Sequence, residues 1–269
     1  MAVRVLVLAA HPDDAEIFAG GLLTRHCRLG NSVKIVSVTD GRCGHHKWSP
    51  EQLVSIRRAE ASAAGERIGA SYETWDFPDA ALVADLRVRE AIIGEIRAFA
   101  PSLVLTHRPY DYHPDHRACG TAVQDASYLI TVPHVCCDVP ALRQAPVIAY
   151  MTDLFTRPCR MRADVLLDVS HEFDTVLQMI ACHRSQVFEW LPFHDGIQIP
   201  ETEEGRLVWL SDWMQAHHQT RVQHFAGELT KRGLPLDERA FIEAYEISEY
   251  ARQPKKTELL SLFPGAETY

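Results

Sequence analysis

Apolar residues in the first half of the chain fall into short runs separated by longer amphipathic stretches. The first run, residues 3–9, is apolar at almost every position, which is typical of a strand buried on both faces of a sheet. We predict strands over residues 3–9, 33–39, 72–77 and 102–106, and helices over residues 15–29, 51–68 and 86–100. Strands that alternate with helices predict a Rossmann-like, mostly parallel sheet flanked by helices, with the active site at the C-terminal ends of the strands.

The second half of the chain is less regular. We predict strands over residues 147–152 and 165–169, and helices over residues 117–129, 171–187, 203–232 and 238–250. The chain has no internal repeat, low-complexity tract or Gly/Ser-rich linker. We therefore predict one domain, in which residues 1–189 form the sheet core and residues 190–269 form a C-terminal helical wrap or lid.

Charge and composition exclude some classes of function. The chain has 27 Lys and Arg against 36 Asp and Glu, so nucleic acid is not an expected partner. No apolar stretch approaches the roughly 18 residues of a membrane span, and no signal-peptide pattern precedes the first strand. The 7 cysteines form no CxxC pair, which favours reduced thiols over a disulfide framework. We expect a cytoplasmic protein.

The segment His11-Pro12-Asp13-Asp14 directly follows the first predicted strand. His11 and Asp14 offer an imidazole nitrogen and a carboxylate oxygen, both ordinary zinc ligands, and Asp13 remains beside them as a proton acceptor. A second interpretation is that Asp13 caps the next helix, with Glu16 completing a capping box. That interpretation leaves His11 unexplained.

A second cluster, His113-Pro114-Asp115-His116, follows another predicted strand. Pro114 fits the first turn of a helix, so His113 and His116 lie one turn apart and share a face. A helix start disfavours a charged histidine, and Asp115 counters that effect. The alternative is a surface helix start with two solvated histidines.

The two clusters can form a single site if their strands belong to one sheet. The C-terminal ends of parallel strands meet at one edge, where ligands bind, so clusters distant in sequence can come together there. Together they supply two histidines and one aspartate, with a fourth position open to water, as in catalytic zinc sites. This combination predicts a metal-dependent hydrolase.

Further motifs extend the pattern along the chain. They are residues 10–16 with Gly20-Gly21, then 39–41, 57–60, 77–79, 113–117, 183–186 and 243–245. In this order they resemble the PIG-L/LmbE-like zinc-dependent de-N-acetylases. That family includes the N-acetylglucosaminyl-phosphatidylinositol, mycothiol-pathway, bacillithiol-pathway and diacetylchitobiose deacetylases.

The resemblance implies metal and catalytic roles for six residues. Asp13 is the general base on a metal-activated water, protonated His113 stabilises the tetrahedral oxyanion, and Asp115 is the charge partner of His113. The implied metal ligands are His11, Asp14 and His116.

The resemblance also points to residues that contact the sugar. Arg57 and Asp79 match such regions, although Arg58 competes with Arg57 for the match. Relatives often carry a mobile tyrosine two residues before the histidine that matches His113, where this chain has an aspartate. Tyr112, or else Tyr110, is the candidate to replace it.

We therefore predict a zinc-dependent N-deacetylase that removes an N-acetyl or other N-acyl group from an N-acetylated amino sugar or glycoconjugate. Fe²⁺, Co²⁺ or Mn²⁺ can replace Zn²⁺ in such a site. The partner is a small-molecule substrate, and we expect a homo-oligomer. The alternatives are a deacylase of a non-sugar amide, or a non-catalytic carbohydrate-binding protein that keeps the metal site. The amino sugar itself depends on loops at residues 41–50, 79–85, 130–146 and 190–205.

Overall fold

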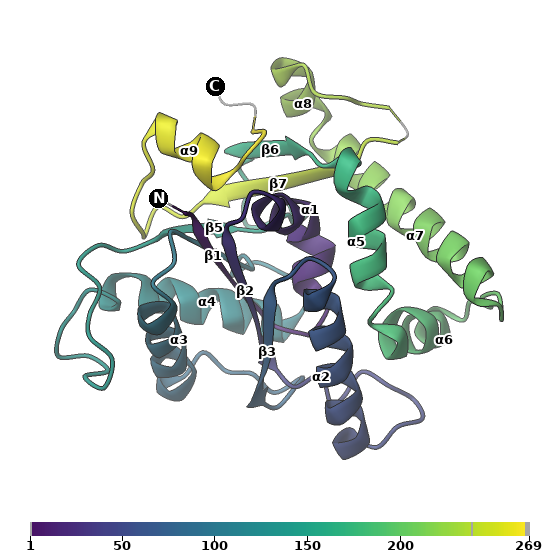
Figure 1. Cartoon of the computed structure of the whole chain (residues 1–269), viewed down its shortest axis with the longest axis horizontal. Helices are drawn as coiled ribbons and strands as arrows, with labels where there is room; N and C mark the ends of the chain where they lie inside the picture. The colour runs from purple at the N-terminus through teal and green to yellow at the C-terminus, as the bar shows by residue number, and fades with distance from the viewer. Residues whose placement is uncertain (1, 238, 267–269) are drawn as a thin grey trace.

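The computed structural model describes residues 2–237 and 239–266, and its centre is a seven-stranded sheet of order β3-β2-β1-β4-β5-β7-β6 (Figure 1). The strands are β1 Arg4–Ala9, β2 Ser32–Thr39, β3 Ser71–Phe77, β4 Leu103–Thr106, β5 Val147–Tyr150, β6 Val165–Asp168 and β7 Ile242–Ile247. The helices are α1 Asp14–Arg28, α2 Pro50–Glu66, α3 Leu86–Phe99, α4 Pro114–Leu129, α5 Phe173–Ile180, α6 Leu191–Asp195, α7 Glu203–His224, α8 Ala226–Arg232 and α9 Lys256–Leu262. A 3₁₀ turn, Ser170–Glu172, and a π-helical turn, Ser185–Trp190, complete the regular structure.

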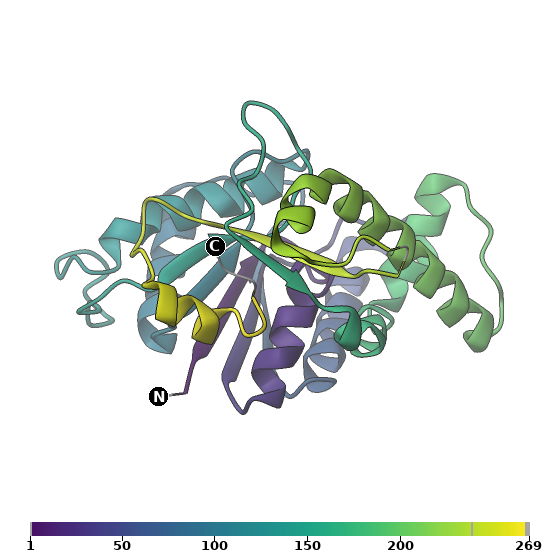
Figure 2. The same cartoon turned by 90° about the horizontal axis from the view of Figure 1, so that it is seen from above.

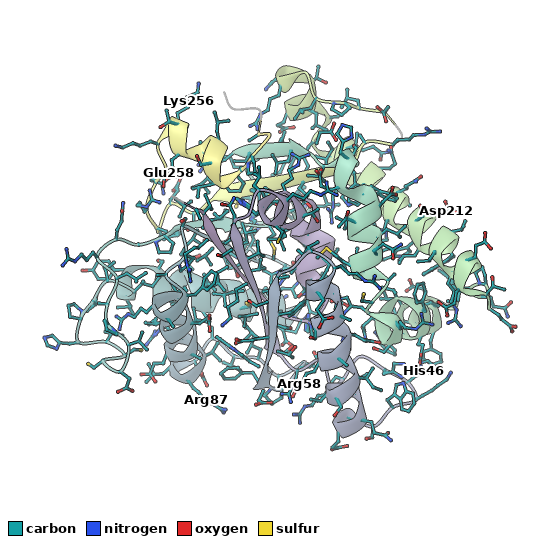
Figure 3. The ribbon with its side chains drawn as sticks, in the orientation of Figure 1. His46, Arg58, Arg87, Asp212, Lys256 and Glu258 are labelled. Atoms are coloured by element: carbon teal, nitrogen blue, oxygen red, sulfur yellow. The ribbon has the colours of Figure 1, made fainter. Side chains whose placement is uncertain are left out.

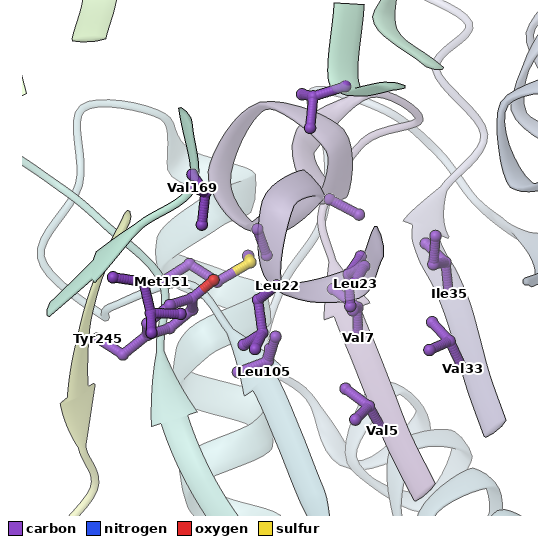
Figure 4. Close-up of a cluster of buried hydrophobic side chains, with 14 of the residues drawn as sticks. Val5, Val7, Leu22, Leu23, Val33, Ile35, Leu105, Met151, Val169 and Tyr245 are labelled. Carbon is purple, nitrogen blue, oxygen red and sulfur yellow. The ribbon is translucent and has the colours of Figure 1, made fainter. Parts of the chain in front are cut away.

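Strand β1 lies at the centre of the parallel part of the sheet, paired with β2 on one side and β4 on the other. Its alternate side chains enter two separate cores, because helices cover both faces (Figure 2). Val5 and Val7 pack with residues of α1 such as Leu22, as Figure 4 shows. Leu6 and Leu8 pack on the opposite face with residues of α3 and α4. The predicted fold class is confirmed.

Strand β7 differs from our prediction, which was a helix over residues 238–250. It lies antiparallel between β5 and β6, so the C-terminal part of the chain contributes a strand to the sheet as well as helices. Glu243 is only 1% exposed, and the partners of its carboxylate are inside the protein. Glu238, where the predicted helix began, lies outside the described residues. The single-domain organisation stays a prediction.

Two other predicted helices are interrupted. Within residues 171–187, helix α5 ends at Ile180, and the π-helical turn begins only at Ser185. The long stretch over residues 203–232 is divided at Phe225, whose backbone leaves helical geometry at ψ 14° and whose ring is fully buried. At the first interruption His183 and Ser185 bind Glu16 of α1 and Glu60 of α2, and at the second Phe225 packs against β6 and β7, so burial outweighs the local preference for one continuous helix.

The carboxylate of Glu243 enters the middle of α1. It accepts hydrogen bonds from the backbone N–H groups of Gly21, at 2.7 Å, and Leu22, at 3.0 Å, and from the hydroxyl of Tyr245. Arg221 donates to the carbonyl of Ile17 in the same helix at 2.8 Å. These contacts tie the helix that follows His11 to the last strand of the sheet.

Gly21 of α1 packs directly against Val169, which follows β6, and this contact gives a stability prediction. A Cβ at Gly21 would lie 2.5 Å from the Cβ of Val169, so Gly21→Ala is expected to lower the free energy of unfolding by about 1–3 kcal/mol. Gly94, within α3, has nothing within 4 Å of its added Cβ, so Gly94→Ala is expected to raise it by about 0.5–1 kcal/mol. Denaturant unfolding of both variants measures the contrast. Equal effects from the two would contradict the packing described here.

Candidate metal centre

The two histidine–carboxylate clusters lie together at the C-terminal ends of neighbouring strands. His11 follows β1, and His113 to His116 follow the loop after β4 and begin α4. The nitrogen Nδ1 of His11 lies 3.2 Å from Nε2 of His116 and 3.4 Å from Oδ2 of Asp14, and Nε2 of His116 lies 3.3 Å from Oδ1 of Asp14. The three predicted metal ligands therefore present their donor atoms to one another.

These distances fit a metal ion. In a tetrahedral zinc site with ligands at 2.0–2.1 Å, ligand atoms are about 3.3 Å apart. Two imidazole nitrogens and a carboxylate, largely shielded from solvent and facing one point, form the donor set that a divalent cation binds. The ligand atoms gather in three overlapping groups, within 4.8 Å in each: His11–His113–His116, Asp14–His107–His116 and His11–Asp79–Asp115.

In each of the two histidines predicted as ligands, the ring nitrogen remote from the site faces a carboxylate. Nε2 of His11 lies 3.2 Å from Oδ1 of Asp79 and 3.3 Å from Oδ2 of Asp115, and Nδ1 of His116 lies 3.2 Å from Oδ1 of Asp111. Carboxylates in these positions orient the rings and increase their basicity as ligands. Asp111 occupies the position where relatives often carry tyrosine, and here it supports His116.

The carboxyl of Asp14 is held ionised by its neighbours. Burial raises its pKa, but His116 and His107 outweigh burial and bring the pKa well below the ordinary value. Asp79 behaves in the same way. Burial raises its pKa, and the hydrogen bond and charge of His11 bring it to about 2. Both groups are therefore carboxylates at neutral pH, as a cation site requires.

His107 is a site residue that our sequence analysis missed. Its ring stacks on His116 at a centroid distance of 4.0 Å, and its Nε2 accepts a hydrogen bond from the backbone N–H of Ala10 at 3.0 Å. Burial and the charge of His116 lower the pKa of His107 to about 4. The only available signal was its place directly after β4, at the same sheet edge as the recognised clusters.

Asp13 has a strained backbone and an unusual carboxylate. It precedes α1 with φ 115°, a left-handed conformation that is uncommon for a residue with a side chain, and its side chain makes no capping hydrogen bond. The backbone N–H donates to the Tyr72 hydroxyl at 3.3 Å, and Oδ2 lies 3.2 Å from the Arg57 guanidinium. Such strain is characteristic of functional positions.

The environment of Asp13 suits a proton acceptor. Burial raises the pKa of its carboxyl, and the charge of Arg57 opposes burial without cancelling it. The capping alternative for Asp13 is wrong, because Glu16 also has another partner: its Oε1 lies 3.0 Å from Nε2 of His183, with both side chains fully buried. Glu16 lies in the first turn of α1, but its carboxylate is turned toward His183.

The predicted link between His113 and Asp115 takes a different form in the structure. The Asp115 carboxylate accepts hydrogen bonds from the backbone N–H groups of Ala80, at 2.7 Å, and Leu82, at 3.1 Å. Its own backbone N–H donates to Nδ1 of His113 at 3.2 Å. Burial, with the charges of His11 and His116, lowers the pKa of His113, and the Asp115 charge opposes this, so the protonated role of His113 stays a prediction. The carboxylate at this helix start instead supports His11.

The three predicted sugar-contacting residues lie in different surroundings. Arg57 is 2% exposed and donates to the Pro12 carbonyl as well as to Asp13. Asp79 is also buried, and Tyr112 is 71% exposed at the mouth of the site, its ring 5.7 Å from that of His113. The competing candidate Arg58, labelled in Figure 3, points outward and pairs with Asp76 on the surface.

Comparison with known proteins agrees with this site. Residues 6–127 match the family described as PIG-L: GlcNAc-PI de-N-acetylase. A probable N-acetyl-alpha-D-glucosaminyl L-malate deacetylase 2 from Bacillus cereus is 30% identical over 222 residues, which cover 77% of this chain and 94% of that protein. The chain belongs to the PIG-L family. The predicted family and the predicted enzyme class, a de-N-acetylase, are confirmed, and a metal cofactor agrees with both the family and the site geometry.

Two further similarities are to another enzyme in sequence and to a solved structure in fold. The 4-oxalmesaconate hydratase of Pseudomonas putida is 28% identical over 69% of this chain and 74% of that protein. The structure of N,N'-diacetylchitobiose deacetylase from Pyrococcus horikoshii superposes with a TM-score of 0.71 at 21% identity, covering 96% of this chain and 89% of that chain. This structural similarity shows the fold. Within the described residues, no helix is long and apolar enough to span a membrane.

Proposed function

We propose that this chain is a zinc-dependent N-deacetylase that hydrolyses the acetamido group of an N-acetylated amino sugar or glycoconjugate. The observation that carries the proposal is the set His11, Asp14 and His116, with their donor atoms 3.2–3.4 Å apart and the buried carboxylate of Asp13 beside them. A protein that only bound carbohydrate would have no need of Asp13. The same residues could also bind Fe²⁺, Co²⁺ or Mn²⁺, and the availability of each metal decides which one occupies the site. We propose zinc.

The reaction needs a Lewis acid, a base and an acid. When bound, zinc polarises the amide carbonyl and makes water more acidic. Asp13 accepts the proton from the attacking water as its oxygen bonds to the carbonyl carbon. Asp13 then returns that proton to the amide nitrogen as the C–N bond breaks. The products are acetate and the free amine, and no covalent enzyme intermediate is required.

His113 stabilises the oxyanion in this proposal as a hydrogen-bond donor. Its Nδ1 accepts the backbone N–H of Asp115, so the proton of the neutral ring is on Nε2. A donor fixed by the backbone in this way needs no reorganisation when charge develops on the substrate oxygen. Arg57 and Asp79, proposed from the sequence as sugar contacts, also hold Asp13 and His11 in place, and Tyr112 contacts the substrate at the entrance.

The test is an assay of the metal-loaded protein. N-acetylglucosamine, N,N'-diacetylchitobiose and N-acetylglucosamine glycosides are incubated with the protein, and released amine and acetate are quantified before and after chelation. We expect equal amounts of the two products, lost on chelation and restored by Zn²⁺. Metal-loaded protein that releases neither product from any of these sugars would overturn the proposal and favour a non-sugar amide.

A second candidate function is addition of water to a carbon–carbon double bond. It is favoured by the similarity to the 4-oxalmesaconate hydratase, which covers about as much of the chain as the similarity to the deacetylases. Hydration also needs an activated water and a base, but it breaks no C–N bond. Loss of the ultraviolet absorbance of a conjugated dicarboxylate, without amine release from the sugars, would establish it.

A further inference from the structure

A shallow pocket adjoins the metal centre on the side of Tyr112. It is formed by the loop after β4, the start of α4 and the loop after β5, and the residues that line it are Pro109, Tyr110, Asp111, Tyr112, Arg117, Phe155, Arg157 and Pro158. Tyr112 joins the pocket to the metal centre, because its ring lies 5.8 Å from that of His116 and 6.2 Å from that of Phe155. A ligand with its acetamido group at the metal centre would extend along this ring into the pocket.

The pocket exposes two positive charges without carboxylate partners. Arg157 is exposed and makes no ion pair or hydrogen bond with any described residue. Arg117 is also exposed, and its guanidinium donates to the backbone carbonyls of Asp111, at 2.6 Å, and Tyr112, at 2.9 Å. Two guanidinium groups at one rim favour a negatively charged ligand.

The acidic groups near the pocket are occupied elsewhere. The Asp111 carboxylate, with a side chain only 7% exposed, accepts the backbone N–H of His113 and faces Nδ1 of His116. Beneath the pocket, Asp153 binds the buried Arg108 through both oxygens at 3.1 Å. Neither carboxylate is directed at the rim, so the charge that a ligand meets there is positive.

We propose that Arg157 and Arg117 bind an anionic group on the part of the substrate remote from the N-acetyl group. The substrate class is then an amino-sugar glycoside whose aglycone carries a carboxylate or a phosphate, held against the aromatic rings of Tyr112 and Phe155. This inference rests on the proposed deacetylase function and narrows it. Arg157 determines specificity, because it contacts the aglycone and not the reacting atoms.

The experiment compares three glycosides of N-acetylglucosamine that differ only in charge: the methyl, the carboxymethyl and the 2-phosphoethyl glycoside. We expect kcat/KM of the wild-type holoenzyme to be about tenfold higher for an anionic glycoside than for the methyl glycoside, mainly through KM. The carboxymethyl and phosphoethyl compounds distinguish the two anions. In Arg157→Gln the ratio of anionic to methyl kcat/KM is expected to lose most of its excess over one, because only Arg117 remains, and Arg157→Lys is expected to retain more of it.

Arg143→Gln is the matched control, because Arg143 is an exposed arginine of another loop that does not line the pocket. We expect it to keep the wild-type ratio. A wild-type enzyme without preference for either anionic glycoside, or an Arg157→Gln variant that keeps the preference, would overturn the proposal. Loss of the preference in Arg157→Gln also excludes binding of the anion by the metal itself.

Calorimetric titration with the same three glycosides separates this inference from the deacetylase function. If no glycoside is turned over but the anionic compounds bind more tightly than the methyl compound, and lose that advantage in Arg157→Gln, the pocket assignment is supported and the deacetylase assignment fails. If all three are turned over and bind equally, the deacetylase assignment is supported and the pocket assignment fails.

Discussion

Replacing Asp13 with Asn is expected to lower kcat by at least about a hundredfold while the protein still binds one metal ion per chain. Asn removes the negative charge that accepts a proton and keeps nearly the same shape. It also tolerates the positive φ of 115° at this position, where Ala would be strained, so Asp13→Asn is the substitution that leaves the fold in place. Deacetylation kinetics and metal analysis on the same preparation measure both quantities.

The control for this variant is Asp76→Asn. Asp76 is a carboxylate paired with a neighbouring arginine, as Asp13 is, but its side chain is 83% exposed and it lies outside the metal centre. It is expected to leave kcat within about twofold of the wild-type value, as for most surface substitutions. If Asp13→Asn retained wild-type turnover, Asp13 would not be the base. If it lost the metal, the carboxylate would act in binding the ion instead.

Replacing His116 with Ala is expected to weaken zinc binding at least about a hundredfold and to abolish measurable turnover. Loss of supporting residues outside the ligand set already costs about 10–100-fold in affinity, and loss of a ligand costs more. His134→Ala is the control, because His134 is an exposed histidine in the loop after α4. Competition titration against a chromogenic chelator measures both affinities. Unchanged affinity in His116→Ala would exclude His116 as a ligand.

In the metal-free protein, the titration of His116 is expected to make the free energy of unfolding depend on pH. Burial lowers the pKa of His116, but the charges of Asp14 and Asp111 outweigh burial and raise the pKa to about 9. Because the folded-state pKa lies above the unfolded value of about 6.5, the proton stabilises the metal-free protein below pH 6.5, and this stabilisation is lost as pH rises toward 9. A bound metal displaces the proton, so zinc affinity is expected to rise with pH across that window.

The parallel part of the sheet was predictable because its signal is local. The strands that precede the two site clusters, β1 and β4, are apolar at almost every position. The position of the ligands then follows from one rule of topology, the meeting of strand C-termini at one edge. Sequence neighbours therefore sufficed to place His11 near His116.

The strand β7 and the partners of Asp115 could not be predicted, because they depend on contacts between residues that are distant in sequence. Residues 238–250 were predicted as a helix, and the backbone groups that satisfy the Glu243 carboxylate lie 222 residues away in α1. The Asp115 carboxylate was assigned to a neighbouring histidine, and its partners are N–H groups of the loop after β3. A buried charge is stable only with such partners, and no local pattern identifies them.

The contact between Glu243 and α1 also sets an order of events during synthesis. The helix that begins at Asp14 is made early, but its middle turn is fixed by a carboxylate that leaves the ribosome near the end of translation. Contacts this distant in sequence form late in folding. We therefore expect the predicted metal ligands next to that helix to reach their final positions only after β7 has joined the sheet. On this expectation, metal uptake follows the addition of β7.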